Sequence, residues 1–256
     1  MLNWSQSKSS GPSILFLHAA GFDQRMWQET IGLLPDFRCI TMDLPGHGLS
    51  KATAMKTFAQ AADEVALTIR AMGEGPVHVA GVSMGAYIGF QYLLRHPDLA
   101  KTAVLSGFQH KPIQISRAAS IMMDASSWVM GLKSIREKMA RSMGIQDVNL
   151  ISALDGSANC TAKTTRLASR LALNFDAEAA LPKVKAKTLV LAGAKEHSAI
   201  KESLSAFSSL PNGAARIVPD LGHGWIGQAP DLFADALRAW IQDSQLPQRL
   251  VSQTPT

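Results

Sequence analysis

Short apolar runs recur along the chain and alternate with longer segments in which the hydrophobic positions are spaced differently. Six runs are rich in β-branched residues and nearly uninterrupted, which is typical of strands buried on both faces of a sheet. These runs are Ser13–His18, Phe37–Met42, Val77–Ala80, Thr102–Ser106, Thr188–Ala192 and Ala215–Val218.

The segments between the runs place apolar residues three or four positions apart, which is the spacing of a helix with one buried face. The pattern predicts helices over residues 57–72, 84–95 and 230–242. The second helix is expected to end before His96-Pro97, because proline disfavours helical backbone in the residue that precedes it. Alternating strands and helices predict an α/β fold with a doubly wound, mostly parallel sheet.

This alternation stops between residues 110 and 182, where the sequence suggests several short helices and no convincing strand. We therefore expect a core built from residues 1–109 and 183–242, with residues 110–182 inserted as a helical cap over one edge of the sheet. The tail, residues 243–256, is polar and contains Pro247 and Pro255. We expect this tail to be disordered.

Composition narrows the class of protein further. The two cysteines, Cys39 and Cys160, offer neither a disulfide framework nor the spacing of a zinc site, so no metal is expected. No apolar run approaches the roughly 20 residues that span a bilayer, and the first residues lack the apolar stretch of a secretory signal. We expect a cytoplasmic protein without a membrane span, as a monomer or a small homo-oligomer.

The net charge of +5 is unevenly distributed. Residues 108–187 carry 12 Lys and Arg against 6 Asp and Glu, a net charge of +6, and the rest of the chain carries 13 against 14, a net charge of −1. The simpler interpretation is a solvated outer face on the helices of this segment, and the alternative is a preference for anionic substrates or partners. No basic run alternates with aromatic residues, so a nucleic-acid partner is not expected.

One motif points to catalysis. The apolar run VHVA is followed by Gly81-Val82-Ser83-Met84-Gly85 and then by a predicted helix. In a G-x-S-x-G sequence between a strand and a helix, the serine occupies the apex of a sharp turn with its hydroxyl exposed, and the glycines allow helix and strand to approach. This context predicts that Ser83 is a nucleophile, although a glycine-rich tight turn is the plainer alternative.

Several segments in this order resemble the α/β-hydrolase superfamily, in its compact branch of cap-bearing esterases, lactonases and relatives. The resemblance covers about residues 12–108 and 186–242 and is not extended to the cap. The segments that carry it are LFLHAAG (15–21), DLPGHGLS (43–50), Gly81–Gly85, LVLAGAKE (189–196) and PDLGHGW (219–225). This family commonly has two strands before the segment equivalent to Ser13–His18, whereas only Leu2–Gln6 is available here. We therefore expect the first strand to be missing, which leaves about seven.

The resemblance implies a general base and an acid for Ser83. His223 follows the last predicted strand and is the final histidine, as the family order of serine, acid and histidine requires. The family places the acid after the penultimate strand, where this chain has Glu196, one methylene longer than the usual aspartate. Asp220 is the alternative acid, only three residues before His223.

The resemblance also implies an oxyanion hole formed by the backbone N–H groups of Met84 and Ala20. The family usually has glycine at the position of Ala19. This difference in sequence concerns the backbone path of the loop that contains Ala20. Four aromatic residues are candidates for an apolar substrate pocket, although residues of this kind more often serve ordinary core or cap packing. They are Phe22, Phe108, Trp128 and Trp225.

Together these residues predict a serine hydrolase, of the carboxylesterase type, that cleaves small esters, lactones or thioesters without a cofactor. A second hypothesis keeps the same three residues for carbon–carbon bond hydrolysis or a lyase-type elimination, because fold and triad do not fix the bond broken. A third is a non-catalytic receptor that binds a small molecule. The substrate itself is not encoded in any motif of the sequence.

Overall fold

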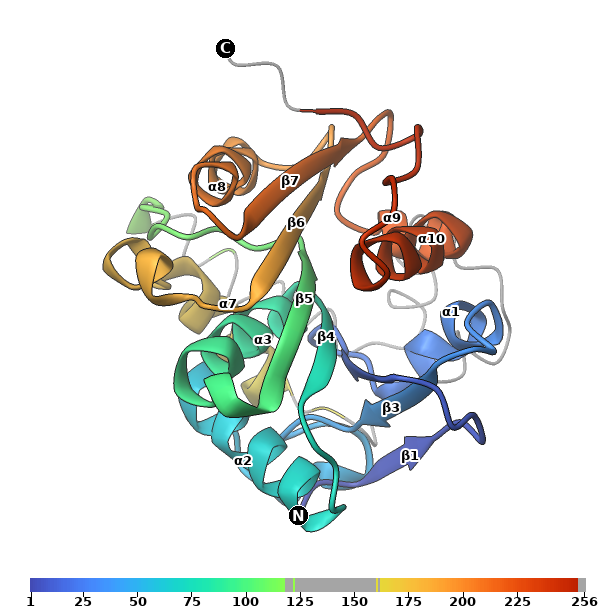
Figure 1. Cartoon of the computed structure of the whole chain (residues 1–256). Coiled ribbons are helices and arrows are strands. Elements are labelled where there is room, and N and C mark those ends of the chain that lie inside the picture. The colour runs from blue at the N-terminus through green and yellow to red at the C-terminus, as the bar shows by residue number, and fades with distance from the viewer. Residues whose placement is uncertain (118–121, 123–159, 161, 253–256) are drawn as a thin grey trace.

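The computed structural model describes residues 1–117, 122, 160 and 162–252. Within these residues the chain forms a seven-stranded sheet with the strand order β1-β3-β2-β4-β5-β6-β7 (Figure 1). All neighbouring strands are parallel except β1 and β3, which are antiparallel. The strands are β1 (Trp4–Gln6), β2 (Ser13–Leu17), β3 (Arg38–Met42), β4 (Val77–Val82), β5 (Ala100–Ser106), β6 (Lys187–Gly193) and β7 (Gly213–Val218).

The six predicted strands are thus confirmed, and a single short strand, β1, precedes β2 as expected. β1 pairs with β3 through the register Trp4↔Met42 and forms one edge of the sheet. It is only three residues long and its side chains are exposed. A short, exposed edge strand limits the unpaired backbone that the sheet offers to other chains.

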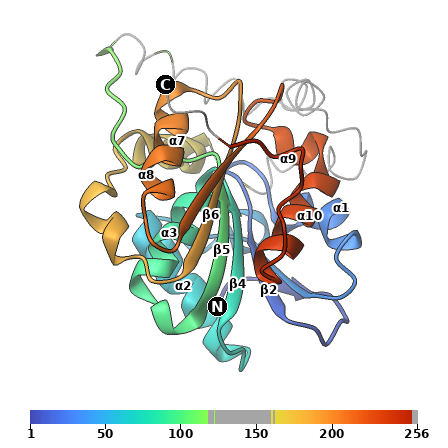
Figure 2. The same cartoon turned by 45° about the horizontal axis from the view of Figure 1, so that its top comes forward.

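Helices cover both faces of the sheet (Figures 1 and 2). On one face lie α2 (Phe58–Ala71), α3 (Met84–Arg95), α7 (Ala162–Leu173) and α8 (Ser198–Ser208). On the other lie α1 (Gln28–Gly32), α9 (Trp225–Gln228) and α10 (Pro230–Ile241). Short 3-10 turns complete the described elements: η1 (Gln24–Trp27), η2 (Gly48–Ser50), η3 (Pro97–Leu99) and η4 (Glu178–Lys183).

The apolar strands supply both cores, because successive side chains of a strand point to opposite faces of the sheet. In β2, Leu15 and Leu17 belong to the core beneath α2, α3 and α8, whereas Ile14 and Phe16 belong to the core beneath α1 and α10. All four side chains are fully buried. Burial on both faces explains why these runs are nearly continuous in hydrophobicity rather than alternating.

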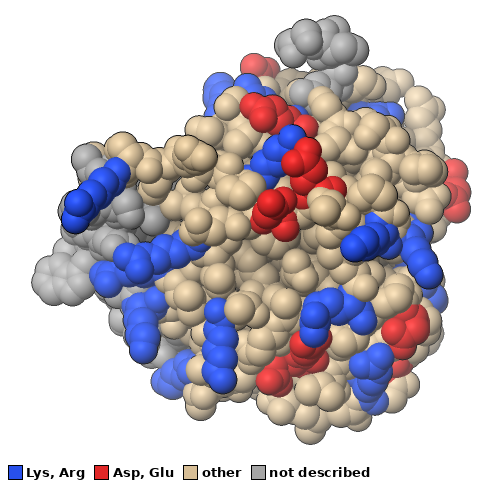
Figure 3. All heavy atoms as spheres, turned by 90° about the vertical axis from the view of Figure 1, so that its left-hand side faces the viewer, with Lys and Arg blue, Asp and Glu red and all other residues tan. Residues whose placement is uncertain are grey.

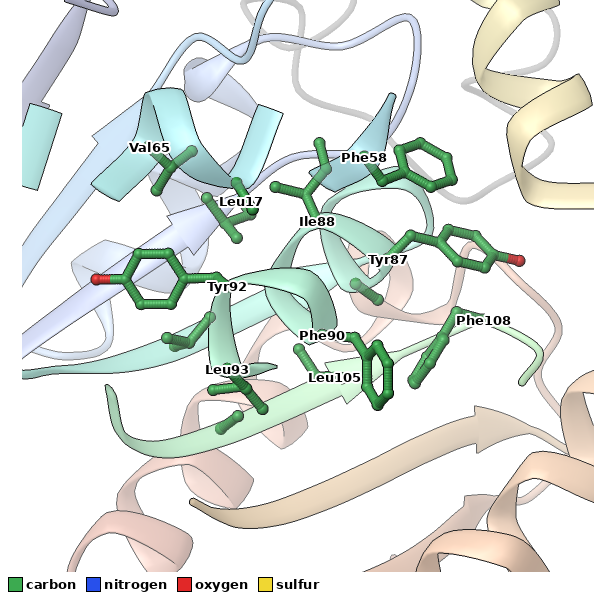
Figure 4. Packing of buried hydrophobic residues seen from close by; sticks show 14 of the residues in the cluster. Leu17, Phe58, Val65, Tyr87, Ile88, Phe90, Tyr92, Leu93, Leu105 and Phe108 are labelled. Atoms are coloured by element: carbon green, nitrogen blue, oxygen red, sulfur yellow. The ribbon is translucent and has the colours of Figure 1, made fainter. Parts of the chain in front are cut away.

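Aromatic rings fill the first of these cores around α3 (Figure 4). Phe58 and Tyr87 stack with their ring centroids 5.0 Å apart, and Tyr87 meets Phe175 edge-on at 4.8 Å. Offset and edge-on contacts of this kind add to the free energy gained by burial alone. The cluster packs α2 and α3 against β5 and fixes the helix that follows Ser83. Its rings are Phe58, Tyr87, Phe90, Phe108, Phe175 and Phe207.

The predicted cap, residues 110–182, lies partly outside the described residues. Its described part includes α7 and η4. The Gln109 amide joins this part to the core by donating to the carbonyl of Ala172 (2.6 Å). Within the predicted cap, the backbone N–H of Ile113 donates to the carbonyl of Leu173 (2.8 Å). α7 is therefore fastened to the segment that leaves β5.

The expectation of a disordered tail is wrong for residues 243–252. Val251 forms an antiparallel bridge with Ile217 of β7 through two backbone hydrogen bonds of 2.8 and 3.0 Å. Leu250 is buried in the core beneath α10, with 6% of its surface exposed. Leu246 also packs against this core, and β7 offers the unpaired edge on which Val251 docks.

The docking of the tail predicts the effect of two neighbouring substitutions. Leu250→Ala is expected to lower the free energy of unfolding by about 2 kcal/mol, because it removes buried methyl groups. Val251→Ala is the matched control, since this side chain is 42% exposed, and it should change the free energy by less than about 0.5 kcal/mol. Urea unfolding of the two variants would contradict the docking if both changes were equally small.

Candidate active site

Ser83 lies at the apex of the turn between β4 and α3, with φ 51° and ψ −120°. A positive φ is strained for a residue with a side chain, and such strain is held only by the surrounding structure. Helix and strand approach so closely here that a Cβ on Gly85 would lie 2.0 Å from the carbonyl oxygen of Leu17. The amide of Ser83 donates to the carbonyl of Ser106 (2.8 Å), which ties the strained residue to β5.

His223 and Glu196 reach Ser83 from two other loops at the carboxyl edge of the sheet. Nε2 of His223 is 3.0 Å from Oγ of Ser83, and Nδ1 is 2.7 Å from Oε2 of Glu196. Because a carboxylate accepts at Nδ1, that nitrogen carries the proton and Nε2 is left to accept from the serine hydroxyl. The sequence-predicted serine, histidine and glutamate are thus brought together in one hydrogen-bonded chain.

The Glu196 side chain has no exposed surface, whereas the His223 side chain is 46% exposed. The second oxygen of the carboxylate, Oε1, accepts the backbone N–H of Gly193 (2.9 Å). The longer glutamate is accommodated by a turn in which its own N–H donates to the carbonyl of Gly193 (3.0 Å). Since Glu196 occupies Nδ1 of His223, the alternative acid, Asp220, is not its partner.

The two amides expected to form an oxyanion hole belong to the turn after β4 and to the loop after β2, and these two strands are neighbours in the sheet. Met84 is the first residue of α3, and Ala20 follows β2 in a half-buried loop. Among the hydrogen bonds of the described residues, neither amide N–H has an acceptor. Ala19, the departure from the family pattern, donates its N–H to the sulfur of Met26 (3.3 Å), which gives this loop its own support.

His18 fixes the loop after β2 to the loop after β3. Its Nδ1 donates to the carbonyl of Ala19 (2.8 Å), and its Nε2 accepts the backbone N–H of Leu44 (2.9 Å). Both ring nitrogens have defined partners only when the imidazole is neutral. Burial lowers the pKa of His18 to about 4 and that of the neighbouring His47 to about 3.

The predicted aromatic pocket is wrong for Phe108 and Trp225. Phe108 and Trp225 have no exposed surface and are part of the two cores, so no ligand can contact them. Phe22 is 6% exposed, and Trp128 lies outside the described residues. A cleft of about 380 Å³ borders His223 and is formed by the acid loop, the histidine loop and the helix that follows. It is lined by Lys195, Asp220, Leu221, Gly222, His223, Gly224 and Gln228.

Two residues at the end of β5 support the site although no motif in the sequence singled them out. Gly107 has φ +72°, and a Cβ there would lie 2.8 Å from Cε1 of His223 and 3.5 Å from Oε2 of Glu196. Ser106 is fully buried and accepts the indole N–H of Trp225 at its hydroxyl (2.9 Å). A glycine directly after a predicted strand was the signal in the sequence that could have identified Gly107. A single serine such as Ser106 gives no comparable signal.

Basic side chains are spread over the face that carries α7 and α8 rather than gathered at one point (Figure 3). This distribution favours the interpretation of a solvated outer face. Within the described ranges no group of three His, Cys, Asp or Glu side chains is arranged to hold a metal ion. No helix in the same ranges combines the length and apolar character that a membrane crossing requires.

Residues 14–236 match the model of the alpha/beta hydrolase family, and the chain belongs to this family. One relative is the (E)-2-((N-methylformamido)methylene)succinate hydrolase of Acinetobacter baylyi, which is 25% identical over 247 residues, 92% of each chain. A second is the 2-succinyl-6-hydroxy-2,4-cyclohexadiene-1-carboxylate synthase of Enterobacter sp., 32% identical over 117 residues. This match spans 44% of the chain and only 45% of that relative.

Solved structures extend the likeness of the fold. A thermophilic esterase from Thermogutta terrifontis, determined with malate bound, matches with a TM-score of 0.74 at 23% identity, over 94% of this chain and 93% of that one. At this identity the match concerns the fold alone.

The contact between Gly107 and His223 predicts a specific loss of reactivity. Gly107→Ala is expected to displace the imidazole and to slow labelling of Ser83 by a fluorophosphonate by about 100-fold, because reactivity depends steeply on the placement of the base. Gly73→Ala is the matched control, since Gly73 has φ +71° and nothing within 4 Å of the added methyl group. Both changes strain the backbone equally, so equal labelling rates would contradict the steric role.

The buried histidines predict how stability depends on pH. An unfolded histidine titrates near 6.5, so below this pH the unfolded chain binds protons that buried His47 cannot, and stability falls as the pH drops toward about 3. His47→Asn can still donate to the carbonyl of Pro45, which His47 contacts at 3.0 Å. Between pH 7 and 4.5 this variant should lose about 2 kcal/mol less stability than wild type.

Urea unfolding at both pH values measures this difference. His197→Asn is the control, because the exposed His197 caps α8 by accepting the N–H of Ala199 and asparagine caps helices equally well. A pH dependence of stability that is the same for His47→Asn and wild type would contradict the lowered pKa of His47.

Proposed function

We propose that the chain is a serine hydrolase that cleaves small carboxylic esters, lactones or thioesters through an acyl-enzyme on Ser83. The observation that carries the proposal is the hydrogen-bonded chain from Ser83 through His223 to the buried Glu196, with distances of 3.0 and 2.7 Å. A serine hydroxyl is a weak nucleophile until a base takes its proton. His223 is that base, and its hydrogen bond to Glu196 favours the tautomer in which Nε2 can accept the proton.

In the proposed reaction, Ser83 attacks the carbonyl carbon while Nε2 of His223 takes its proton. Glu196 stabilises the resulting imidazolium through Nδ1, and the ring then passes its proton to the leaving alcohol or thiol. Water, activated by the same nitrogen, attacks the acyl-enzyme and releases the acid. The backbone amides of Met84 and Ala20 are the proposed donors to the oxyanion, where each such donor contributes roughly 3 kcal/mol.

A second candidate keeps these residues and changes the bond that is broken. The relatives described above are named for a succinate derivative and for a cyclohexadiene carboxylate, and one of them is named a synthase rather than a hydrolase. These names favour carboxylate-bearing substrates and include chemistry other than ester hydrolysis. Steady turnover of a β-diketone, with none of simple esters, would support this candidate over the first.

Hydrolysis of short p-nitrophenyl esters at neutral pH tests the main proposal. Ser83→Ala and His223→Ala should each lower kcat by 10⁴-fold or more, as roughly expected for triad members. Glu196→Gln should lower it by about 10³-fold, because an amide no longer favours the correct tautomer. Glu202→Gln, the same change at an exposed position in α8, should leave kcat unaltered.

The outcomes separate the hypotheses. Wild type that cleaves no ester but reacts with a fluorophosphonate at Ser83 has a working nucleophile, and the ester proposal then fails in favour of the second candidate. Wild type that neither turns over nor reacts refutes the enzyme and supports a receptor. Activity that survives Ser83→Ala refutes the nucleophile.

A further inference from the structure

Ser106, the last residue of β5, is hydrogen-bonded to both sides of the candidate site. Its carbonyl accepts the backbone N–H of Ser83 (2.8 Å), and its hydroxyl accepts the indole N–H of Trp225 (2.9 Å). Ser106 and Trp225 have no exposed surface. One buried residue therefore contacts the backbone of the nucleophile and the residue two positions after the histidine.

The loop that carries His223 is joined to the acid loop by the backbone N–H of Lys195, which donates to the carbonyl of Leu221 (2.9 Å). Glycines flank the histidine, and its side chain is 46% exposed. The helix that follows, α9, has only four residues, which is too short to be stable in isolation. Trp225 is the first buried residue after the loop, and its amide closes the loop by donating to the carbonyl of Gly222 (3.1 Å).

The Trp225 ring is held from two sides. It meets the ring of Phe233 edge-on, with centroids 5.7 Å apart, and its single N–H points to Ser106. Packing against Phe233 keeps the ring in the core, but a contact between apolar surfaces tolerates small shifts. A hydrogen bond is directional, so the bond to Ser106 restricts where the loop can lie.

We propose that Trp225 is a positioning residue for His223, an inference that rests on the proposed function. Its indole N–H donates to the hydroxyl of Ser106, and this bond fixes the position of the histidine loop relative to Ser83. Because the carbonyl of the same Ser106 accepts from the amide of Ser83, two hydrogen bonds through Ser106 connect the backbone of the nucleophile with the residue that ends the histidine loop. Trp225 contacts no reacting atom and acts through the placement of the imidazole.

Trp225→Phe tests this role, since it keeps an aromatic ring against Phe233 and removes the N–H. The matched control is Trp240→Phe. The indole of Trp240 also donates a hydrogen bond, to the carbonyl of Lys187 (3.3 Å), but Lys187 begins β6 and so lies at the opposite edge of the sheet. With p-nitrophenyl esters, Trp225→Phe should lower kcat by about 10- to 100-fold with KM within about twofold of wild type. Trp240→Phe should leave both constants within about twofold.

A double-mutant cycle identifies the bond itself. Ser106→Ala should cause the same loss of kcat as Trp225→Phe, and the double variant should lose no more than either single one. Ser106→Ala also serves as the test if Trp225→Phe does not fold. Additive losses, or a loss in Trp240→Phe equal to that in Trp225→Phe, would overturn the proposal.

A spectroscopic measurement separates this inference from the ester proposal. The proton that His223 shares with Glu196 should give a low-field NMR signal, assigned by its disappearance in Glu196→Gln. Trp225→Phe should broaden or shift this signal, and Trp240→Phe should leave it unchanged. If wild type cleaves no ester, the function fails while the NMR comparison still tests the positioning. An unaltered signal in Trp225→Phe overturns the positioning whatever the activity.

Discussion

Everything at the candidate site depends on the parallel pairing of four adjacent strands. β4, β5, β6 and β7 run in the same direction, so their carboxyl ends lie at one edge of the sheet. The loops after β4, β6 and β7 carry Ser83, Glu196 and His223, residues far apart in the sequence. The register places Val82 beside Ser106 and Ser106 beside Leu191, so the strands end nearly level and the three side chains can meet.

The central strand of this group, β5, contributes no member of the hydrogen-bonded chain but supports all of it. Ser106 holds the amide of Ser83, and Gly107 leaves the space that the ring of His223 fills. The Glu196 carboxylate, packed near the same glycine, is fully buried and has both oxygens engaged. A buried carboxylate without such partners would be costly, so its two hydrogen bonds serve stability as well as orientation.

Much of this arrangement was predictable from sequence because it depends on local patterns. The strands and the helix after Ser83 follow from apolar runs and the turns between them, whereas the roles expected of Glu196 and His223 came from the resemblance to a known family. The burial of Phe108 and Trp225 was not predictable, because aromatic residues near a site have the same local pattern whether they face a ligand or the core. The tail was also misjudged, since its docking depends on the free edge of β7, which the tail's own composition does not reveal.

The neutral ring of His18 links two loops that are separated in the sequence, the one after β2 and the one after β3. It bonds the carbonyl of Ala19 on one side and the amide of Leu44 on the other, so the segment that contains Ala20 is braced by the segment after β3. The two segments therefore form one structural unit across adjacent strands. Anyone who grafts the loop after β2 from this protein onto another scaffold would have to move both segments together.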